Sequence, residues 1–157
     1  MRNVIPSARQ IQTMNLALSQ ERAIQIRKLA DTYNSSFADA IARLIRHAVA
    51  AGEISGTVPG YEIEPQEDGN FRVFLKGNLL APFNKAQLHA FAALIEDVLE
   101  TGEATISLDL SEPIEVLRHG KVLRFNVLRA GTARINVSAP VSVAQDFAAD
   151  LYRHAEK

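Results

Sequence analysis

The chain has 157 residues, 47% hydrophobic and 22% charged, with a formal net charge of −1, which is the composition of a folded globular protein rather than a disordered one. It contains no cysteine, and this excludes disulfide bonds, cysteine-ligated zinc and thiol catalysis. No stretch approaches the roughly 18 apolar residues that cross a membrane, and residues 1–7 lack the apolar run of a secretory signal, so no membrane contact and a cytoplasmic location are expected.

A strand is predicted first, over Thr13–Leu18, because large apolar side chains alternate there with smaller or polar ones. Strict alternation is typical of a strand with one buried face. The two faces are Met14, Leu16 and Leu18 on one side, and Thr13, Asn15 and Ala17 on the other.

Two amphipathic helices are predicted to follow. Ser19 offers an N-cap for the first, which runs to about Thr32, and residues 34–35 form the turn. Ser36 with Asp39 resembles a capping box at the start of the second helix, with Asp in place of the usual Glu or Gln. The apolar stripes are Ala23, Ile26, Leu29, Ala30 and Tyr33 on the first helix, and Phe37, Ile41, Leu44, Ile45, Ala48 and Val49 on the second.

A linker is predicted after Gly52, which ends the second helix as a C′ glycine does. Residues 54–60 are rich in Gly, Pro and hydroxyl side chains and show no periodicity. The charge changes sign there, from +3 over residues 1–54 (seven basic, four acidic) to −4 over the rest (ten basic, fourteen acidic), which indicates that the first part meets a polyanion. The predicted domains are residues 1–54, a linker over 55–60, and residues 61–157.

The remainder of the chain is predicted to form a separate antiparallel α+β domain that mediates oligomerisation, effector sensing or partner contact. Strands are expected over residues 61–64, 71–76, 78–81, 104–110, 114–118, 122–128 and 133–138. Helices are expected over residues 85–99, ended by Gly102, and from Pro140 onward. Residues 71–99 and 122–154 share the order of strands followed by a helix, so a duplicated unit stays open as an alternative.

No catalytic constellation is found in either predicted domain. The sequence has no Gly-rich phosphate loop, no nucleophile elbow and no carboxylate pair in a recognisable context. The four histidines lie far apart, without the spacing of a zinc site. The acids of residues 62–68 are interpreted as a solvated sheet edge. We therefore expect neither an enzyme nor a protein that depends on a metal or a cofactor.

The predicted strand has no partner strand before the linker, yet its backbone groups need hydrogen-bond partners. Pairing with the same strand of a second copy satisfies them and creates a two-fold homodimer interface. The expected dimer core consists of Met14, Leu16, Leu18, Ile26, Leu29, Phe37, Ile41 and Ile45.

The opposite face of such a two-stranded ribbon carries Thr13, Asn15 and Ala17 from each copy, and a ribbon of this kind fits the major groove of DNA. Asparagine can pair with adenine through two hydrogen bonds. The N–H groups of Phe37 and Ala38, at the start of the second helix, are expected to hold a phosphate. The side chains expected to assist them are those of Ser35, Ser36 and Arg9.

These residues resemble a known family. The run Met14–Ser19, the pair Leu29–Ala30, the run Asn34–Phe37 and Ile41 are similar to the ribbon-helix-helix superfamily of the Arc, methionine and CopG repressors, over about residues 8–54. The resemblance implies that alternate ribbon residues enter the major groove and that the start of the second helix grips phosphate. Two residues depart from the family pattern, because Ala17 replaces a long basic or polar residue and Asn34 stands where glycine is common.

The expected function is that of a homodimeric, sequence-specific, double-stranded DNA-binding protein, a transcriptional repressor of bacterial type. An antitoxin or a plasmid relaxosome or partition accessory, acting mainly through a protein partner, is the alternative. Residues 61–157 also faintly resemble the Whirly and PUR-type folds, which bind single-stranded nucleic acid by aromatic stacking on a basic sheet, although the net acidity of this region argues against that activity.

Overall fold

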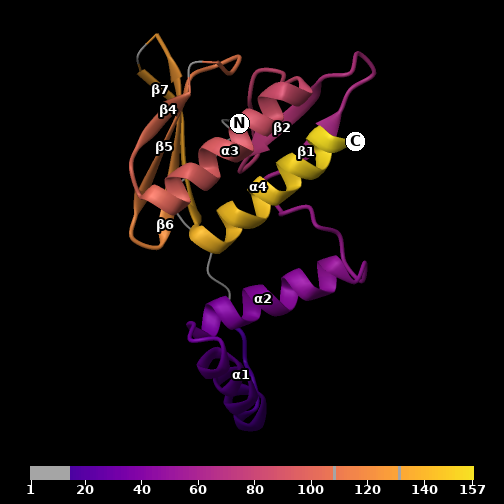
Figure 1. Cartoon of the computed structure of the whole chain (residues 1–157), viewed down its shortest axis with the longest axis vertical. Helices are drawn as coiled ribbons and strands as arrows, with labels where there is room; N and C mark the ends of the chain where they lie inside the picture. Colours follow the sequence, from indigo (N-terminus) through magenta and orange to yellow (C-terminus); the bar gives the residue numbers. More distant parts are fainter. Residues whose placement is uncertain (1–14, 108, 131) are drawn as a thin grey trace, which may run out of the picture. The chain divides into compact units, whose positions relative to one another are not determined.

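The structure is a computed structural model that describes residues 15–107, 109–130 and 132–157. These residues form four helices and two antiparallel sheets, which confirms the predicted α+β class (Figure 1). The chain divides into two compact units, one ending at Ile45 and the other running from Arg46 to Lys157. Each unit is described separately below.

The first unit contains the two predicted helices. Helix α1 spans Gln20–Thr32 and helix α2 begins at Phe37 and runs to Ala50, so that the border between the units falls within α2. Ser19 is the N-cap of α1, and its hydroxyl accepts a hydrogen bond from the N–H of Arg22 at 3.4 Å. Asn34, in the turn between the helices, has a φ of 47°. Asparagine tolerates this left-handed conformation better than most residues, which explains how the turn forms without glycine.

The predicted strand of the first unit lies partly outside the described residues, because Thr13 and Met14 are not among them. Residues 15–18 form no hydrogen-bonded strand within the single chain, and Ser19, which follows them, has an extended backbone. The strand was expected to pair with a second copy, so it stays a prediction.

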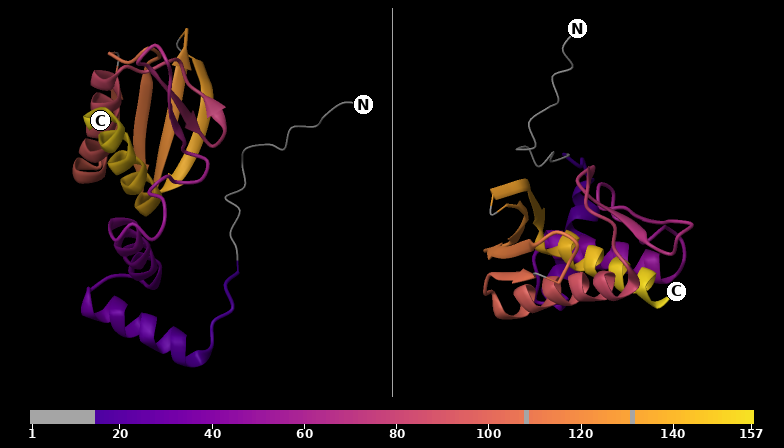
Figure 2. Two further views of the ribbon diagram at one scale, coloured as in Figure 1. Left: turned by 90° about the vertical axis from the view of Figure 1, so that its right-hand side faces the viewer. Right: turned by 90° about the horizontal axis from the view of Figure 1, so that it is seen from above.

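The second unit contains two sheets and two helices (Figures 1 and 2). In one sheet the order is β1-β2-β3, and in the other it is β4-β5-β6-β7, with every neighbouring pair antiparallel. The elements are β1 (Ile63–Pro65), β2 (Phe71–Leu75), β3 (Asn78–Leu79), α3 (Lys85–Thr101), β4 (Thr105–Ser107), β5 (Ile114–His119), β6 (Val122–Arg129), β7 (Thr132–Pro140) and α4 (Val141–Glu156). The order of strands followed by a helix thus occurs twice.

A single hydrophobic core holds the second unit together. Helices α3 and α4 pack side by side, and α3 begins with a capping box between Asn84 and Gln87. The aromatic rings of Phe91 and Phe147 lie at the centre, with ring centroids 5.8 Å apart. The buried faces of the strands follow the predicted alternation, as in β2, where Phe71, Val73 and Leu75 are buried.

Several predicted strands are shorter or shifted in the structure, and the one expected over residues 78–81 is reduced to Asn78–Leu79. The strand expected over residues 61–64 lies at Ile63–Pro65, and the one expected over 104–110 is reduced to Thr105–Ser107. In the second case the chain leaves the sheet because other partners hold it. The Ser111 hydroxyl donates to the carbonyl of Pro82, and the Glu112 carboxylate accepts from the N–H of Ala81.

The predicted linker is attached to the second unit. The Arg153 guanidinium donates a hydrogen bond to the carbonyl oxygen of Gly56 at 2.9 Å, and Val58 forms a β-bridge with Tyr61. A Cβ atom on residue 56 would meet the Arg153 guanidinium, so a side chain there would require Arg153 to move. This loop is therefore packed against α4 at Gly56.

Candidate nucleic-acid interface

The start of α2 is closed by the predicted capping box. The Ser36 hydroxyl oxygen accepts a hydrogen bond from the backbone N–H of Asp39 at 3.1 Å. In return, the backbone N–H and the hydroxyl of Ser36 both donate to Oδ2 of Asp39, at 3.2 and 2.6 Å. The cap makes the helix begin at Phe37, where the sequence predicted it.

The cap leaves the first two N–H groups of the helix open. The backbone N–H groups of Phe37 and Ala38 have no hydrogen-bond acceptor among the residues that the structure describes. A helix N-terminus of this kind attracts anions through its N–H groups and its dipole. The Asp39 carboxylate lies in the same turn and carries the opposite charge, so it lowers the attraction for a phosphate.

The serine hydroxyls at this end differ from the expected arrangement. The hydroxyl of Ser36 takes part in the cap. The Ser35 hydroxyl oxygen is buried and has no hydrogen-bond partner in the described part of the chain, while the Ser35 N–H donates to the carbonyl of Ala30. To reach a phosphate, Ser35 would have to turn outward. Arg9, the remaining residue expected to contact phosphate, lies outside the described residues.

The predicted ribbon residues that are described lie in solvent. Asn15 and Ala17, expected to contact bases, are exposed. On the other face, Leu16 is 72% exposed and Leu18 is also exposed. Nothing among the described residues of the first unit covers these leucines. Thr13 and Met14, the remaining ribbon residues of these two faces, lie outside the described residues.

The helices of the first unit also leave most of the predicted dimer core uncovered. Its described residues bury only two apolar side chains, Ala30 and Ala40. Ile45 remains 48% exposed, and Leu44, which belongs to the predicted apolar stripe of the second helix but not to the predicted dimer core, is 46% exposed. The other predicted core residues are half-buried, namely Ile26, Leu29, Phe37 and Ile41.

Two features of the first unit were missed from the sequence. Ile24 is an exposed apolar side chain at the edge of the apolar stripe of α1. The sequence feature that could have identified it is its position next to Ala23, which belongs to that stripe. The guanidinium carbon of Arg43 lies 3.6 Å from the centre of the Tyr33 ring, a cation–π contact that joins α2 to the end of α1. This contact holds Arg43 against Tyr33, whereas Arg27 and Lys28 are exposed on α1.

The comparisons with known proteins leave the resemblance as a prediction. No protein-family model, curated protein or solved structure matches the chain. Across the described ranges, none of the helices is both long and apolar enough to cross a membrane. Within the same ranges, no group of three or more His, Asp or Glu side chains is arranged to hold a metal ion.

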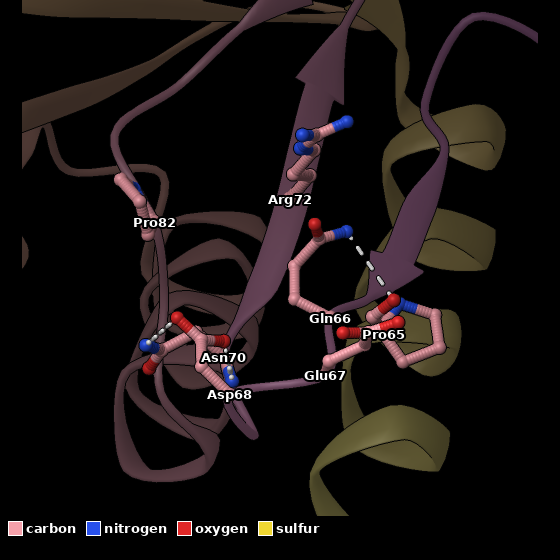
Figure 3. Close-up of a pocket in the computed structure, with 7 residues that line it drawn as sticks. All are labelled: Pro65, Gln66, Glu67, Asp68, Asn70, Arg72 and Pro82. Carbon is pink, nitrogen blue, oxygen red and sulfur yellow. Dashed lines mark hydrogen bonds between the residues drawn. The ribbon is translucent and has the colours of Figure 1, made fainter.

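The second unit has a shallow groove of about 520 Å³ beside the turn between β1 and β2 (Figure 3). The lining side chains are partly engaged with one another, since Asp68 accepts hydrogen bonds from the backbone and the amide of Asn70. These hydrogen bonds lower the pKa of the Asp68 carboxyl. Together with the exposed Glu64 and Glu67, Asp68 belongs to the acidic edge expected from the sequence. The groove presents Arg72 as its lining cation and shows no catalytic arrangement.

Proposed function

We propose that the chain is a homodimeric, sequence-specific, double-stranded DNA-binding protein that acts as a transcriptional repressor. Its ribbon would consist of Thr13–Leu18 from two copies and would lie in the major groove. The observation that carries the proposal is the uncovered apolar surface of the first unit, where Leu16, Leu44 and Ile45 are between 46% and 72% exposed.

The energy of burial explains why this surface calls for a second copy. Covering one leucine or isoleucine side chain stabilises a protein by about 1.5–3 kcal/mol. The first unit, Met1–Ile45, is close to the size of about 40 residues below which a chain usually needs oligomerisation, a metal or disulfides to fold. The described part of the first unit buries two alanines, and the chain has no cysteine. A two-fold partner supplies the missing cover and also the missing strand.

The DNA-binding part of the proposal is supported by the exposed residues before α1 and by the start of α2. Asn15 and Ala17 are exposed next to the leucines that a partner would cover. The open N–H groups of Phe37 and Ala38 offer a phosphate contact that positions the protein. Asn15 then supplies the base contact, through two hydrogen bonds to adenine.

The folded second unit favours a repressor over an antitoxin. A toxin-binding segment is usually a short disordered tail, whereas the second unit has a continuous core from Tyr61 to Leu151. A folded domain of this kind is suited to effector sensing or to assembly of dimers.

The proposal is tested by enriching bound duplexes from a random DNA library at low salt with the full chain. A single enriched motif is expected, bound by a dimer. Asn15→Ala should then lower the affinity for that motif by about 1–3 kcal/mol, with the fold retained. Gln20→Ala, at the exposed first position of α1, is the matched control and should bind as the unchanged protein does. Failure to enrich any motif would reject the function.

A further inference from the structure

One charged side chain of the second unit is buried. Asp150, on α4, is 4% exposed, and it is the one buried polar or charged residue in the part of the chain that the structure describes. Its Oδ1 atom accepts a hydrogen bond from Nη2 of Arg153 at 3.0 Å, whereas its Oδ2 atom is buried without a hydrogen-bond partner among the described residues. Burying a carboxylate with one oxygen unpaired lowers stability, so this ion pair calls for a role other than stabilising the fold.

Arg153 joins the buried carboxylate to the loop that follows α2. The same Nη2 atom that donates to Asp150 also donates to the carbonyl oxygen of Gly56, at 2.9 Å. The Arg153 side chain is itself 41% exposed, so it can leave the loop without opening the hydrophobic core. At residue 56 the loop is therefore held by an arginine that Asp150 orients.

Gly56 serves this contact by having no side chain. The six other glycines that the structure describes have a positive φ, but Gly56 does not, so its backbone conformation is open to other residues. A Cβ atom at this position would overlap the Arg153 guanidinium. Glycine is therefore suited to residue 56 by the approach of Arg153 and not by the path of the chain.

The charged groups that act on Asp150 lie at the end of α4. Burial raises the pKa of the Asp150 carboxyl, and the positive charges of Arg153, His154 and Lys157 offset this rise only in part. Nε2 of His154 lies 3.7 Å from Oδ1 of Asp150, and its ring packs edge-on against Phe71 of β2. Burial lowers the pKa of His154, and a protonated His154 favours the charged form of Asp150. The loop contributes only an uncharged carbonyl group.

We propose that Arg153 and Asp150 form an acid-sensitive latch, which holds Gly56 on α4 while the Asp150 carboxylate is charged and releases it when that carboxylate takes up a proton. Once Asp150 is neutral, the guanidinium has lost its counterion and is better solvated by water than by one carbonyl oxygen. The loop then remains attached through the β-bridge of Val58 with Tyr61. The latch thus sets how freely the loop between α2 and β1 moves, and this inference does not depend on the proposed function.

Acid opens the latch without unfolding the second unit through Asp150. Because the Asp150 pKa is higher in the folded than in the unfolded chain, the stability that this group contributes is complete below the ordinary pKa of an aspartate. It is lost as the pH rises through the raised value. Uptake of the proton therefore favours the folded unit while it removes the ion pair with Arg153.

The test measures the order of the Gly56 and Thr57 amides in the full chain by ¹⁵N relaxation over a pH series. Order parameters of about 0.85 are expected for the latched loop at neutral pH, and values below about 0.6 for the released loop in acid. Asp150→Asn, which resembles the protonated acid, and Arg153→Gln should both be released at every pH. Glu156→Gln removes a carboxylate from the exposed end of α4. It is the matched control and should behave as the unchanged chain does.

Gly56→Ala releases the latch from the loop side, because its Cβ atom displaces the guanidinium. In the Arg153→Gln background this effect should vanish, since no guanidinium is left to displace. His154→Gln removes a positive charge that faces Asp150, so the transition of the loop should move to higher pH.

Order parameters near 0.85 in both Asp150→Asn and Arg153→Gln overturn the latch, and so does a Gly56→Ala effect that simply adds to that of Arg153→Gln. A loop of the unchanged chain that stays ordered at every pH at which the second unit is folded overturns its acid sensitivity. Circular dichroism shows whether each variant is folded. If Asp150→Asn is not, Arg153→Gln and Gly56→Ala decide the latch, and the pH series of the unchanged chain decides the response to acid.

Discussion

Helices α2 and α3 begin in the same way, but their apolar faces differ in burial. Each starts with a reciprocal cap, Ser36 with Asp39 in the first unit and Asn84 with Gln87 in the second. The apolar face of α3 is buried under α4 and the strands, whereas Ile45, on the apolar face of α2, is half exposed. Local signals therefore suffice to start a helix, but they do not supply its cover.

The difference extends to the two units as a whole. The second unit buries five phenylalanines and a full set of aliphatic side chains in one core. The described residues of the first unit have the amphipathic pattern without such a core, and under the proposed function a second copy completes it. Its unfolding should then depend on protein concentration, while that of the second unit should not.

The largest effect is expected at the uncovered ribbon. Leu16→Glu removes from each proposed dimer two leucines that the second copy would cover, and the expected loss is about 3–6 kcal/mol of association free energy. Sedimentation velocity over a concentration series should show a monomer where the unchanged chain is a dimer. Gln20→Glu introduces the same charge at an exposed polar position and should remain dimeric. If the Leu16→Glu protein were as dimeric as the unchanged protein, the first unit would not depend on a second copy through Leu16, and the proposed difference between the two units would be wrong.

A comparable loss is expected in the core of the second unit, without a change in oligomeric state. The Phe147 ring is buried, with centroid distances of 5.3 Å to the Tyr61 ring and 5.8 Å to the Phe91 ring. Phe147→Ala should lower the free energy of unfolding of this unit by about 3–5 kcal/mol, as measured by urea denaturation. Ala149→Ser, on the exposed side of α4, should change it little. Dissociation of the dimer by Phe147→Ala alone would show that the two units are not independent.

The two capping boxes give a smaller and more direct comparison. Ser36→Ala and Asn84→Ala should each cost about 1 kcal/mol of helix stability. Because the proposed dimer buries the apolar face of α2, the first change should weaken association, by up to about 30-fold when both copies carry it. The second should lower the melting temperature of the second unit and leave association unchanged. If Ser36→Ala and Asn84→Ala changed the dissociation constant of the dimer equally, association would not depend on the first unit alone.

The smallest effect concerns alkaline pH. Burial raises the pKa of the Tyr61 phenol from 10.0 to about 12. Since this pKa is higher in the folded than in the unfolded chain, the contribution to stability is complete below pH 10 and is lost as the pH rises toward 12. Tyr61→Phe cannot ionise, so the unfolding free energy of its second unit should fall less over that interval. If the unfolding free energies of the two proteins depended on pH in the same way over this interval, the raised pKa of Tyr61 would not contribute to stability.

Most helices and strands could be predicted because their signals are local. Alternation in residues 71–75, the cap at Ser36 and the glycine at residue 102 each act within a few neighbours along the chain. The prediction was wrong where a distant residue holds the backbone. Residues 109–110 were expected to continue a strand, but the neighbouring Ser111 and Glu112 bind the segment at residues 81–82 instead.

The candidate interface could be predicted as a set of residues, but not as an arrangement. Periodicity placed Leu16 and Ile45 on apolar faces and Asn15 on a polar face, and the contact of Asn15 with bases stays a prediction. The inward Ser35 hydroxyl and the stacking of Arg43 on Tyr33 depend on how two helices meet, and no residue spacing reports that.

By itself the sequence determined which helices and strands form and which side of each is apolar, because these properties depend on neighbours one to four residues apart. Only the tertiary structure decided which of those sides are covered. It brings Arg118 to the end of α3 and ties Gly56 to Arg153 across the chain. Such pairings join residues far apart in sequence, and their energies arise only when the whole unit has assembled.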